Sequence, residues 1–427
     1  MYRIRIAPSC RSLRLHLQPQ FQLSSRHPDS VSIKPTPRNM QSKSQSQTLQ
    51  TFTSALSTLY GPLTPSSIPN PSTWTPPQNS GGHKGRYLWT DAFGVLALLT
   101  LHTETNRNIN SKTDSSNHYL ALAARLVDTV HHILGRNRSG SSPLPGATES
   151  NPLGGGLRIG KVDESGSDGD GQYHHYLTLW MFALNRMSMA TNDPKYNQQA
   201  IALAKAIHGP FFINRGSEKP RMVWKMSMDL SRPLVASEGN LDPIDGFVVF
   251  RLLQAAACHF EKGGKGDGGT VLEDEIEDYA RVMKRKGEHF VSLDPLDLGM
   301  TMWTVHWVLE EDWAQRLAER CFDQIYELLE MHRYLDRSMK YRLAFREFGT
   351  ALGLRCMAEQ EVEKERAVDL KAYSDQILDV WRPVMEASLS ADAMPEDLKP
   401  ITRVMYAAAL IPGGKRLPES LQYKSSR

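Results

Sequence analysis

The sequence predicts an all-α protein, an (α/α)6 toroid in which six helical hairpins close into a ring with long loops at one rim. Three observations favour this fold. Two kinds of apolar segment alternate from residue 49 onward, each kind occurs six times, and strand-like runs are short, as at 156–161 and 221–228. Because hairpins stacked in an open solenoid usually repeat with a tighter period, the irregular spacing favours a closed ring.

The first kind of segment is apolar on nearly all sides, which is typical of a helix buried on every side. The second kind is amphipathic at helical spacing and predicts a helix with one wet face. We expect inner helices at 92–101, 176–184, 247–257, 300–309, 345–357 and 401–411. We expect outer helices at 47–60, 118–134, 195–207, 272–285, 312–331 and 366–381, the first pairing with the last inner helix.

An acidic residue stands close to the start of four predicted inner helices: Asp91, Asp245, Asp297 and Glu347. Such an acid often has a structural role, because it accepts backbone N–H bonds and complements the helix dipole. In a closed ring of parallel inner helices, however, all these acids lie at one rim. Two long connections, 135–173 and 209–244, enter from that rim, and long loops are often functional.

The overall composition excludes several function classes. Fifty basic residues stand against 47 acidic ones, so we expect neither a nucleic-acid partner nor a membrane surface. The longest apolar stretch, 95–101, is far shorter than the ~20 residues that span a bilayer. Four cysteines are scattered without a Cys-x-x-Cys pair, which is typical of reduced thiols in an intracellular protein. They are Cys10, Cys258, Cys321 and Cys356.

The chain divides by composition into a leader (1–45), the helical domain (46–415) and a C-terminal tail (416–427). The leader is rich in Arg, Ser, Gln and Pro and carries a single acid, Asp29. Low hydrophobicity with net charge predicts a disordered tail on a cytoplasmic protein. The same composition is typical of a mitochondrial transit peptide, and that alternative stays open. We expect the domain to fold without the leader.

The polar stretch at 164–176 leads directly into an inner helix. Asp168 and Asp170 resemble part of a calcium loop, but Leu179 stands where that loop requires a glutamate. His174 and His175 point about 100° apart on a helix, so they do not chelate one metal as a His-x-x-x-His pair does. The sequence therefore predicts no metal and no cofactor.

Two interpretations of this stretch remain. Either a rim histidine is simply hydrogen-bonded, or Asp170 and one of the two histidines recognise a substrate or transfer protons. In the second case Gln172 and Tyr173 are candidate binding residues.

A second polar stretch lies at 224–246. Glu238, Asp242 and Asp245 place three carboxylates at the mouth of the third inner helix. Trp224 and Lys225 precede them as candidate binding residues. Elsewhere Trp89 offers a stacking face for a sugar ring, whereas Trp303 is expected to pack in the core.

Three segments carry a resemblance to a known family: 87–94 (YLWTDAFG), 155–161 (GGLRIGK) and 168–180 (DGDGQYHHYLTLW). Together with the repeated hairpins, they resemble the six-hairpin glycosidase-like superfamily, and in particular its fungal members. The likeness runs from about residue 49 to 414. It implies a rim pocket with acidic residues on or near the starts of inner helices, and Asp91 and Asp245 match that placement. The superfamily includes hydrolases, lyases, epimerases and proteins without catalysis, so the fold alone assigns no reaction.

The first functional hypothesis is a carbohydrate-active hydrolase acting on a small molecule or an oligosaccharide. Glycoside cleavage needs one protonated carboxyl and a second carboxylate. We expect Asp91 and Asp245 in these roles, with Asp170 and Glu238 in reserve. Crowded carboxylates repel, so at least one of them is expected to have a raised pKa.

Two other hypotheses stay open. One is a sugar epimerase that uses His174 or His175 together with His306, since the histidine pKa lies near neutrality. The other is a ring that binds carbohydrate or protein without catalysis. Asp297 and Glu347 are expected to be mainly structural, each costing about 1 kcal/mol or less when replaced by its amide. The oligomeric state is not predicted.

Overall fold

The computed structural model describes residues 38–77, 87–107, 117–166, 169–261, 270–360, 364–388 and 398–413, with side chains from residue 45 on. The chain forms two compact units, Met1–Ser44 and Gln45–Arg427, and every side chain discussed below belongs to the second. Most of the predicted leader, the predicted tail and Asp168 lie outside the described residues.

The described part of the chain is predominantly helical, so the prediction of an all-α protein is confirmed. The even-numbered helices are α2 (Leu88–Arg107), α4 (His174–Thr191), α6 (Asp242–Glu261), α8 (Pro295–Val305), α10 (Ala344–Gln360) and α12 (Lys399–Leu410). The odd-numbered helices are α1 (Arg38–Tyr60), α3 (His118–Leu134), α5 (Lys195–Phe211), α7 (Glu273–Val282), α9 (Asp312–Tyr326) and α11 (Lys364–Ser388). Two π-helical segments, η5 (Met283–Gly287) and η7 (Glu327–Met331), follow α7 and α9, and a 3-10 helix, η6 (His306–Val308), follows α8.

The strands in the described ranges have two residues each. They are β1 (Gln172–Tyr173), β2 (Phe212–Ile213), β3 (Arg221–Met222) and β4 (Lys225–Met226). The strand-like run at 221–228 therefore forms β3 and β4, whereas the run at 156–161 forms no strand.

Each even-numbered helix contacts the next one along the chain, and α12 contacts α2. Paired contacts advance in the same direction along neighbouring helices. His174 lies beside Asp242 at the starts of α4 and α6, and further along Asn185 donates to the carbonyl of Leu252. The same order holds at the four other junctions. Contacts between α6 and the segment from α8 onward are Asp245–Thr304 and then Arg251–Glu311, and those between α8 and α10 are Pro295–Thr350 and then Gly299–Gly353. Those between α10 and α12 are Phe348–Tyr406 and then Arg355–Leu410, and those between α2 and the segment from α12 onward are Trp89–Met405 and then Thr100–Gly413.

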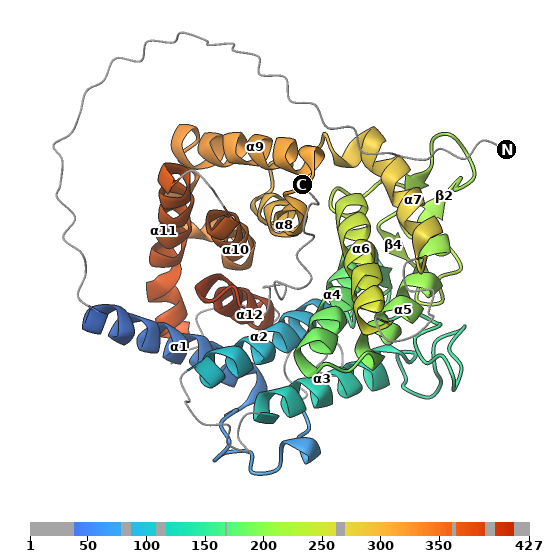
Figure 1. The fold of residues 1–427 in the computed structure, drawn as a ribbon, viewed down its shortest axis with the longest axis horizontal. Coiled ribbons are helices and arrows are strands. Elements are labelled where there is room, and N and C mark those ends of the chain that lie inside the picture. Colours follow the sequence, from blue (N-terminus) through green and yellow to red (C-terminus); the bar gives the residue numbers. More distant parts are fainter. Residues whose placement is uncertain are drawn as a thin grey trace, which may run out of the picture. The chain divides into compact units, whose positions relative to one another are not determined.

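The odd-numbered helices lie outside the even-numbered ones within residues 45–427 (Figure 1). The contrast follows from the sequence: α9 is amphipathic and buries one face, whereas the first fourteen residues of α2 are all buried. Asp294 starts α8 as an N-cap whose side chain accepts from the N–H groups of Leu296 and Asp297. A glycine pair, Gly299 and Gly353, lets α8 and α10 approach so closely that a Cβ on either would clash with backbone.

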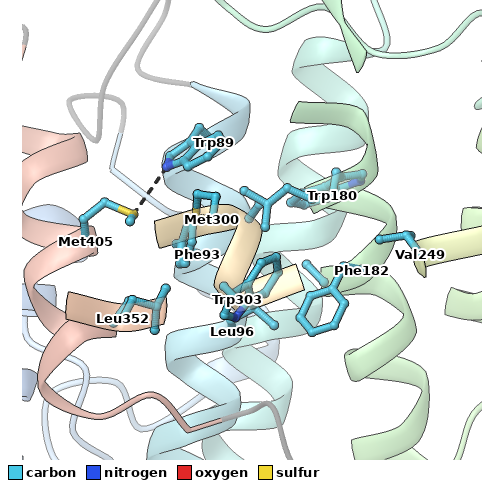
Figure 2. Close-up of a cluster of buried hydrophobic side chains, with 14 of the residues drawn as sticks. Trp89, Phe93, Leu96, Trp180, Phe182, Val249, Met300, Trp303, Leu352 and Met405 are labelled. Carbon is cyan, nitrogen blue, oxygen red and sulfur yellow. Dashed lines mark hydrogen bonds between the residues drawn. The ribbon is translucent and has the colours of Figure 1, made fainter. Parts of the chain in front are cut away.

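A cluster of large apolar side chains fills the space between the even-numbered helices (Figure 2). We call it the central cluster, and its labelled members come from α2, α4, α6, α8, α10 and α12. They are Trp89, Phe93, Leu96, Trp180, Phe182, Val249, Met300, Trp303, Leu352 and Met405. The prediction that Trp303 packs in the core is confirmed, because its side chain is buried there.

Candidate functional site

The two long connections of the sequence are joined beside the start of α4. β1 pairs with β4 in antiparallel register, which sets Tyr173 opposite Lys225. The backbone N–H of His174 then donates to the carbonyl of Trp224 at 3.0 Å. One small sheet thus fixes both loops to the first turn of α4.

Gln172 and Asp170 hold these loops together. Each polar atom of the buried Gln172 amide bonds to backbone: Oε1 accepts from Leu157 N, and Nε2 donates to the carbonyls of Gly155 and Met228. Because that amide is occupied, we leave Gln172 out of the candidate site.

Asp170 has its acceptor atoms occupied in the same way. Its Oδ2 accepts from Arg138 and Arg158, both at 3.0 Å, and its Oδ1 accepts from the N–H groups of Gly160 and Gly171, also at 3.0 Å. The side chain of Asp170 is fully buried. A buried carboxylate with four donors has the surroundings of a structural anchor, so we leave Asp170 out of the candidate site as well.

The acids at the helix starts fall into two groups according to the side that they face. Trp89 and Phe93 point from α2 into the central cluster (Figure 2), and Asp91 lies about 200° from each around the helix. Its Oδ1 accepts from the hydroxyl of Tyr60 in α1 at 2.9 Å, and the carboxyl is fully buried. Asp91 therefore faces the outer helix and not the central cluster, a geometry that does not favour the expected pairing of Asp91 with Asp245 in one pocket.

Glu347 also faces an outer helix. It lies about 140° from Leu352 around α10, away from the central cluster. Arg342 donates to both of its oxygens, at 2.8 and 2.5 Å, and the indole of Trp381 in α11 donates to Oε2 at 2.7 Å. The structural role expected of Glu347 fits this geometry, but a buried ion pair is a stronger interaction than a helix-start contact.

Asp242 links the starts of α4 and α6. Its Oδ1 lies 3.2 Å from Nδ1 of His174 and 3.9 Å from Nδ1 of His175. His174 is fully buried, and its Nε2 lies 2.6 Å from the hydroxyl of Tyr279 in α7. Burial raises the pKa of Asp242, but the two histidines outweigh that effect and hold it below its ordinary value.

His175 is the more accessible of the two histidines, with 23% of its side chain exposed. Its ring packs on Trp89 at 5.9 Å and on Tyr176 at 4.5 Å between centroids. Burial lowers the pKa of His175 to about 4, the charge on Asp242 opposes this, and His174 acts in the same direction as burial. His175 is therefore neutral at pH 7.

Asp245 faces inward. It lies about 40° from Val249 around α6, and Val249 belongs to the central cluster. Thr304 of α8 donates to its Oδ1 at 2.8 Å. Burial raises the pKa of Asp245 well above its ordinary value, the charges on Asp242 and Asp297 raise it further, and the bond from Thr304 opposes them. At least one carboxyl of the predicted set thus has a raised pKa, although burial contributes more to it than the crowding of carboxylates that was expected to produce it.

Asp297 lies beside this group at the start of α8. Its side chain is half-buried, and burial raises its pKa. The charge on Asp294 raises that pKa too, whereas hydrogen bonds with Asn240 and Ser292 lower it. The sequence reasoning classed Asp297 as structural and left it out of the candidate site. Its nearness to Asp245 depends on how α6 and α8 pack, which no local pattern reports.

The remaining predicted residues lie in the joined loops. Glu238 pairs with Arg285 at 2.5 Å and lies 3.9 Å from Arg221. Trp224 is half-buried, and its ring meets Tyr173 edge-on at 5.3 Å. Lys225 is buried, with Nζ 5.0 Å from the centre of the Tyr173 ring and 3.2 Å from the Gly166 carbonyl.

His306 lies in η6, where its Nδ1 bonds to the carbonyl of Trp303 and its ring packs beside Trp307. The structure thus brings together His174, His175, Asp242 and Asp245 and adds Asp297. We call these five residues the inner-start group.

Metal and membrane criteria give negative results for the described residues. No group of three or more His, Cys, Asp or Glu side chains there is arranged to hold a metal ion. No helix in the described ranges combines the length and the apolar character needed to cross a bilayer.

Comparisons with known proteins give no match: no family model, no curated protein and no solved structure matches the chain.

Proposed function

We propose that the chain is an (α/α)6 toroid of the six-hairpin glycosidase-like type and that it hydrolyses a glycosidic bond at the inner-start group. The cycle of contacts through the even-numbered helices, their common direction and the outer position of the odd-numbered helices support the toroid. The single observation that carries the function is the state of the inward-facing Asp245, whose pKa is raised by burial and by the charges on Asp242 and on the less buried Asp297.

Asp245 is the proposed general acid. Glycoside hydrolysis requires a carboxyl that keeps its proton near neutral pH and gives it to the leaving oxygen. Desolvation and two neighbouring negative charges favour the neutral form of Asp245. Thr304 holds Oδ1 by a hydrogen bond, which leaves the other oxygen of the carboxyl to carry the proton.

Asp297 is the proposed second carboxylate. Two interacting carboxyls share protons unequally, and the more buried one keeps its proton while the more solvated one ionises. Asp297 is half-buried and accepts hydrogen bonds that favour its charged form. It is therefore placed to activate water or to attack the sugar.

Aromatic side chains beside the inner-start group supply the proposed sugar-binding surface. His175 and Tyr176 are partly exposed and form this surface, and their rings contact those of Trp89 and Tyr173, which are buried. Flat aromatic faces next to carboxyl groups suit a ligand that has both apolar ring faces and hydroxyls.

A second candidate function has an observation of its own. His175 is neutral, partly accessible and backed by the ionised Asp242, an arrangement that orients a histidine to take up a proton. Asp245, whose pKa is raised, belongs to the same inner-start group, so one base and one acid are available for epimerisation. This pair differs from the two histidines suggested by the sequence, because His306 lies in η6, with its Nδ1 bonded to the Trp303 carbonyl.

The decisive experiment incubates the full chain with a panel of oligosaccharides and measures new reducing ends. Asp245→Asn and Asp297→Asn should each abolish hydrolysis, whereas Asp323→Asn, an exposed acid of α9, should not. Carbon-bound proton exchange with deuterated water and no new reducing ends would favour the epimerase. Ligand binding with neither reaction would make the chain a binding ring. Loss of hydrolysis in a folded Asp91→Asn variant alone would contradict the site proposed.

A further inference from the structure

A buried arginine lies deeper along the same face of α4 as His175. Arg186 is 3% exposed, and its spacing from His175 and Phe182 places all three on one side of the helix. Its guanidinium carbon lies 5.5 Å from the centre of the Phe182 ring and 5.0 Å from that of Trp307. The cation is therefore inside the protein, among the aromatic rings of the central cluster.

Arg186 forms no ion pair with any carboxylate in the described ranges. Its Nε donates to Oδ1 of the neighbouring Asn185 at 3.0 Å, and Nη2 donates to the same oxygen. The amide of Asn185 in turn donates to Asn197 and to the Leu252 carbonyl. Nη1 is buried without a hydrogen-bond partner. Stacking on aromatic rings compensates part of the free-energy cost of desolvating the cation, but it gives the N–H groups of Nη1 no acceptor.

Two other buried N–H donors nearby also lack a hydrogen-bond acceptor. The indole Nε1 atoms of Trp303 and Trp307 also have no hydrogen-bond partner. Both rings pack on Phe182, at 4.8 and 5.3 Å between centroids. A guanidinium and two indole groups are donors only. Three such donors come from side chains that pack around a single phenylalanine ring, and an anionic acceptor is the group that they lack, in an environment of low polarity where the attraction is strong.

We propose that Arg186, Trp303 and Trp307 form an internal binding site for a small monoanion, a halide or a simple carboxylate. The chemistry of the site selects charge and size, because cationic and neutral donors favour an anion and the surrounding aromatic rings exclude a bulky one. Burial lowers the pKa of Arg186 to about 9, so the guanidinium remains charged at neutral pH. The site stands apart from the inner-start group and does not depend on the proposed hydrolysis.

The first test measures thermal unfolding of the full chain at constant ionic strength while gluconate, a much larger monoanion, is replaced by chloride or formate. A ligand that binds only the folded state raises the melting temperature with its concentration. We expect a rise with chloride, and Arg186→Met should abolish that rise. Arg316→Met removes an exposed arginine of α9 and should retain it.

The second test uses the unmutated protein, so it holds even if Arg186→Met fails to fold. Crystals soaked in bromide should show an anomalous peak within hydrogen-bonding distance of Arg186 Nη1. A peak together with stabilisation by chloride alone identifies a halide site, and equal stabilisation by formate identifies a general monoanion site. Equal melting temperatures in all three salts with no anomalous peak would overturn the proposal and indicate that water satisfies the donors.

Discussion

Replacing Glu347 by glutamine tests whether the acid at the start of α10 is a minor helix-start contact or half of a buried ion pair. The side chains of Arg342 and Glu347 are 1% and 2% exposed, and three N–H groups converge on the carboxylate. In Glu347→Gln the new amide NH2 faces one of those donors, and Arg342 stays buried without a counter-charge. Breaking a buried pair from one side costs ~3–5 kcal/mol, against ~1 kcal/mol for a lost helix-start interaction.

Equilibrium unfolding in urea, followed by circular dichroism, measures that difference directly. The double variant Arg342→Met with Glu347→Gln should recover most of the loss, because removing both charges is often close to neutral. Asp297→Asn is the matched control, since this half-buried acid should cost about 1 kcal/mol or less. A loss in Glu347→Gln no larger than that of the control would refute the reasoning.

Three further predictions concern pH and the loops. The pKa of Asp245 is raised in the folded protein, so its favourable contribution to the free energy of unfolding is present below about pH 4 and is lost as pH rises. In urea unfolding, Asp245→Asn should therefore be more stable than wild type at pH 7, and this advantage should vanish near pH 4. Burial lowers the pKa of His131 to about 4, and its Nε2 accepts from Trp180, so stability should fall between pH 6.5 and 4, and less steeply in His131→Gln. Asp170→Asn should speed proteolytic cleavage within 135–173 while leaving the helical circular dichroism signal unchanged.

Helix positions were predictable from the sequence because each helix carries its own local signal. The amphipathic run at 118–134 coincides with α3, and the apolar run at 92–101 lies inside α2. Boundaries shift by a few residues where a cap decides them, as at α8, which starts after Asp294. The closeness of the two long loops also followed from the order of the elements, and β1 and β4 join them.

The direction in which each helix-start acid points was not predictable, and the reason is physical. An amphipathic helix shows its buried face in its sequence, but α2 is buried all round, so its pattern carries no rotational phase. Asp91 therefore looked equivalent to Asp245, although one meets Tyr60 and the other Thr304. The pairing of Asp170 with Arg138 and Arg158 is hidden for a related reason, because it depends on how a long loop folds back.

The acids that face the outer helices differ from Asp245, which faces inward, in the hydrogen bonds that their carboxyls accept. Asp91 binds Tyr60 of α1 and Glu347 binds Trp381 of α11, so these contacts tie even-numbered helices to odd-numbered ones. The two carboxyls accept hydrogen bonds in that role. Asp245 instead has a desolvated carboxyl that accepts one hydrogen bond from Thr304. That single bond does not compensate for the hydration that the carboxyl loses on burial. Groups kept in a costly protonation state are typical of functional sites, and this contrast is why we assign chemistry to the inner-start group.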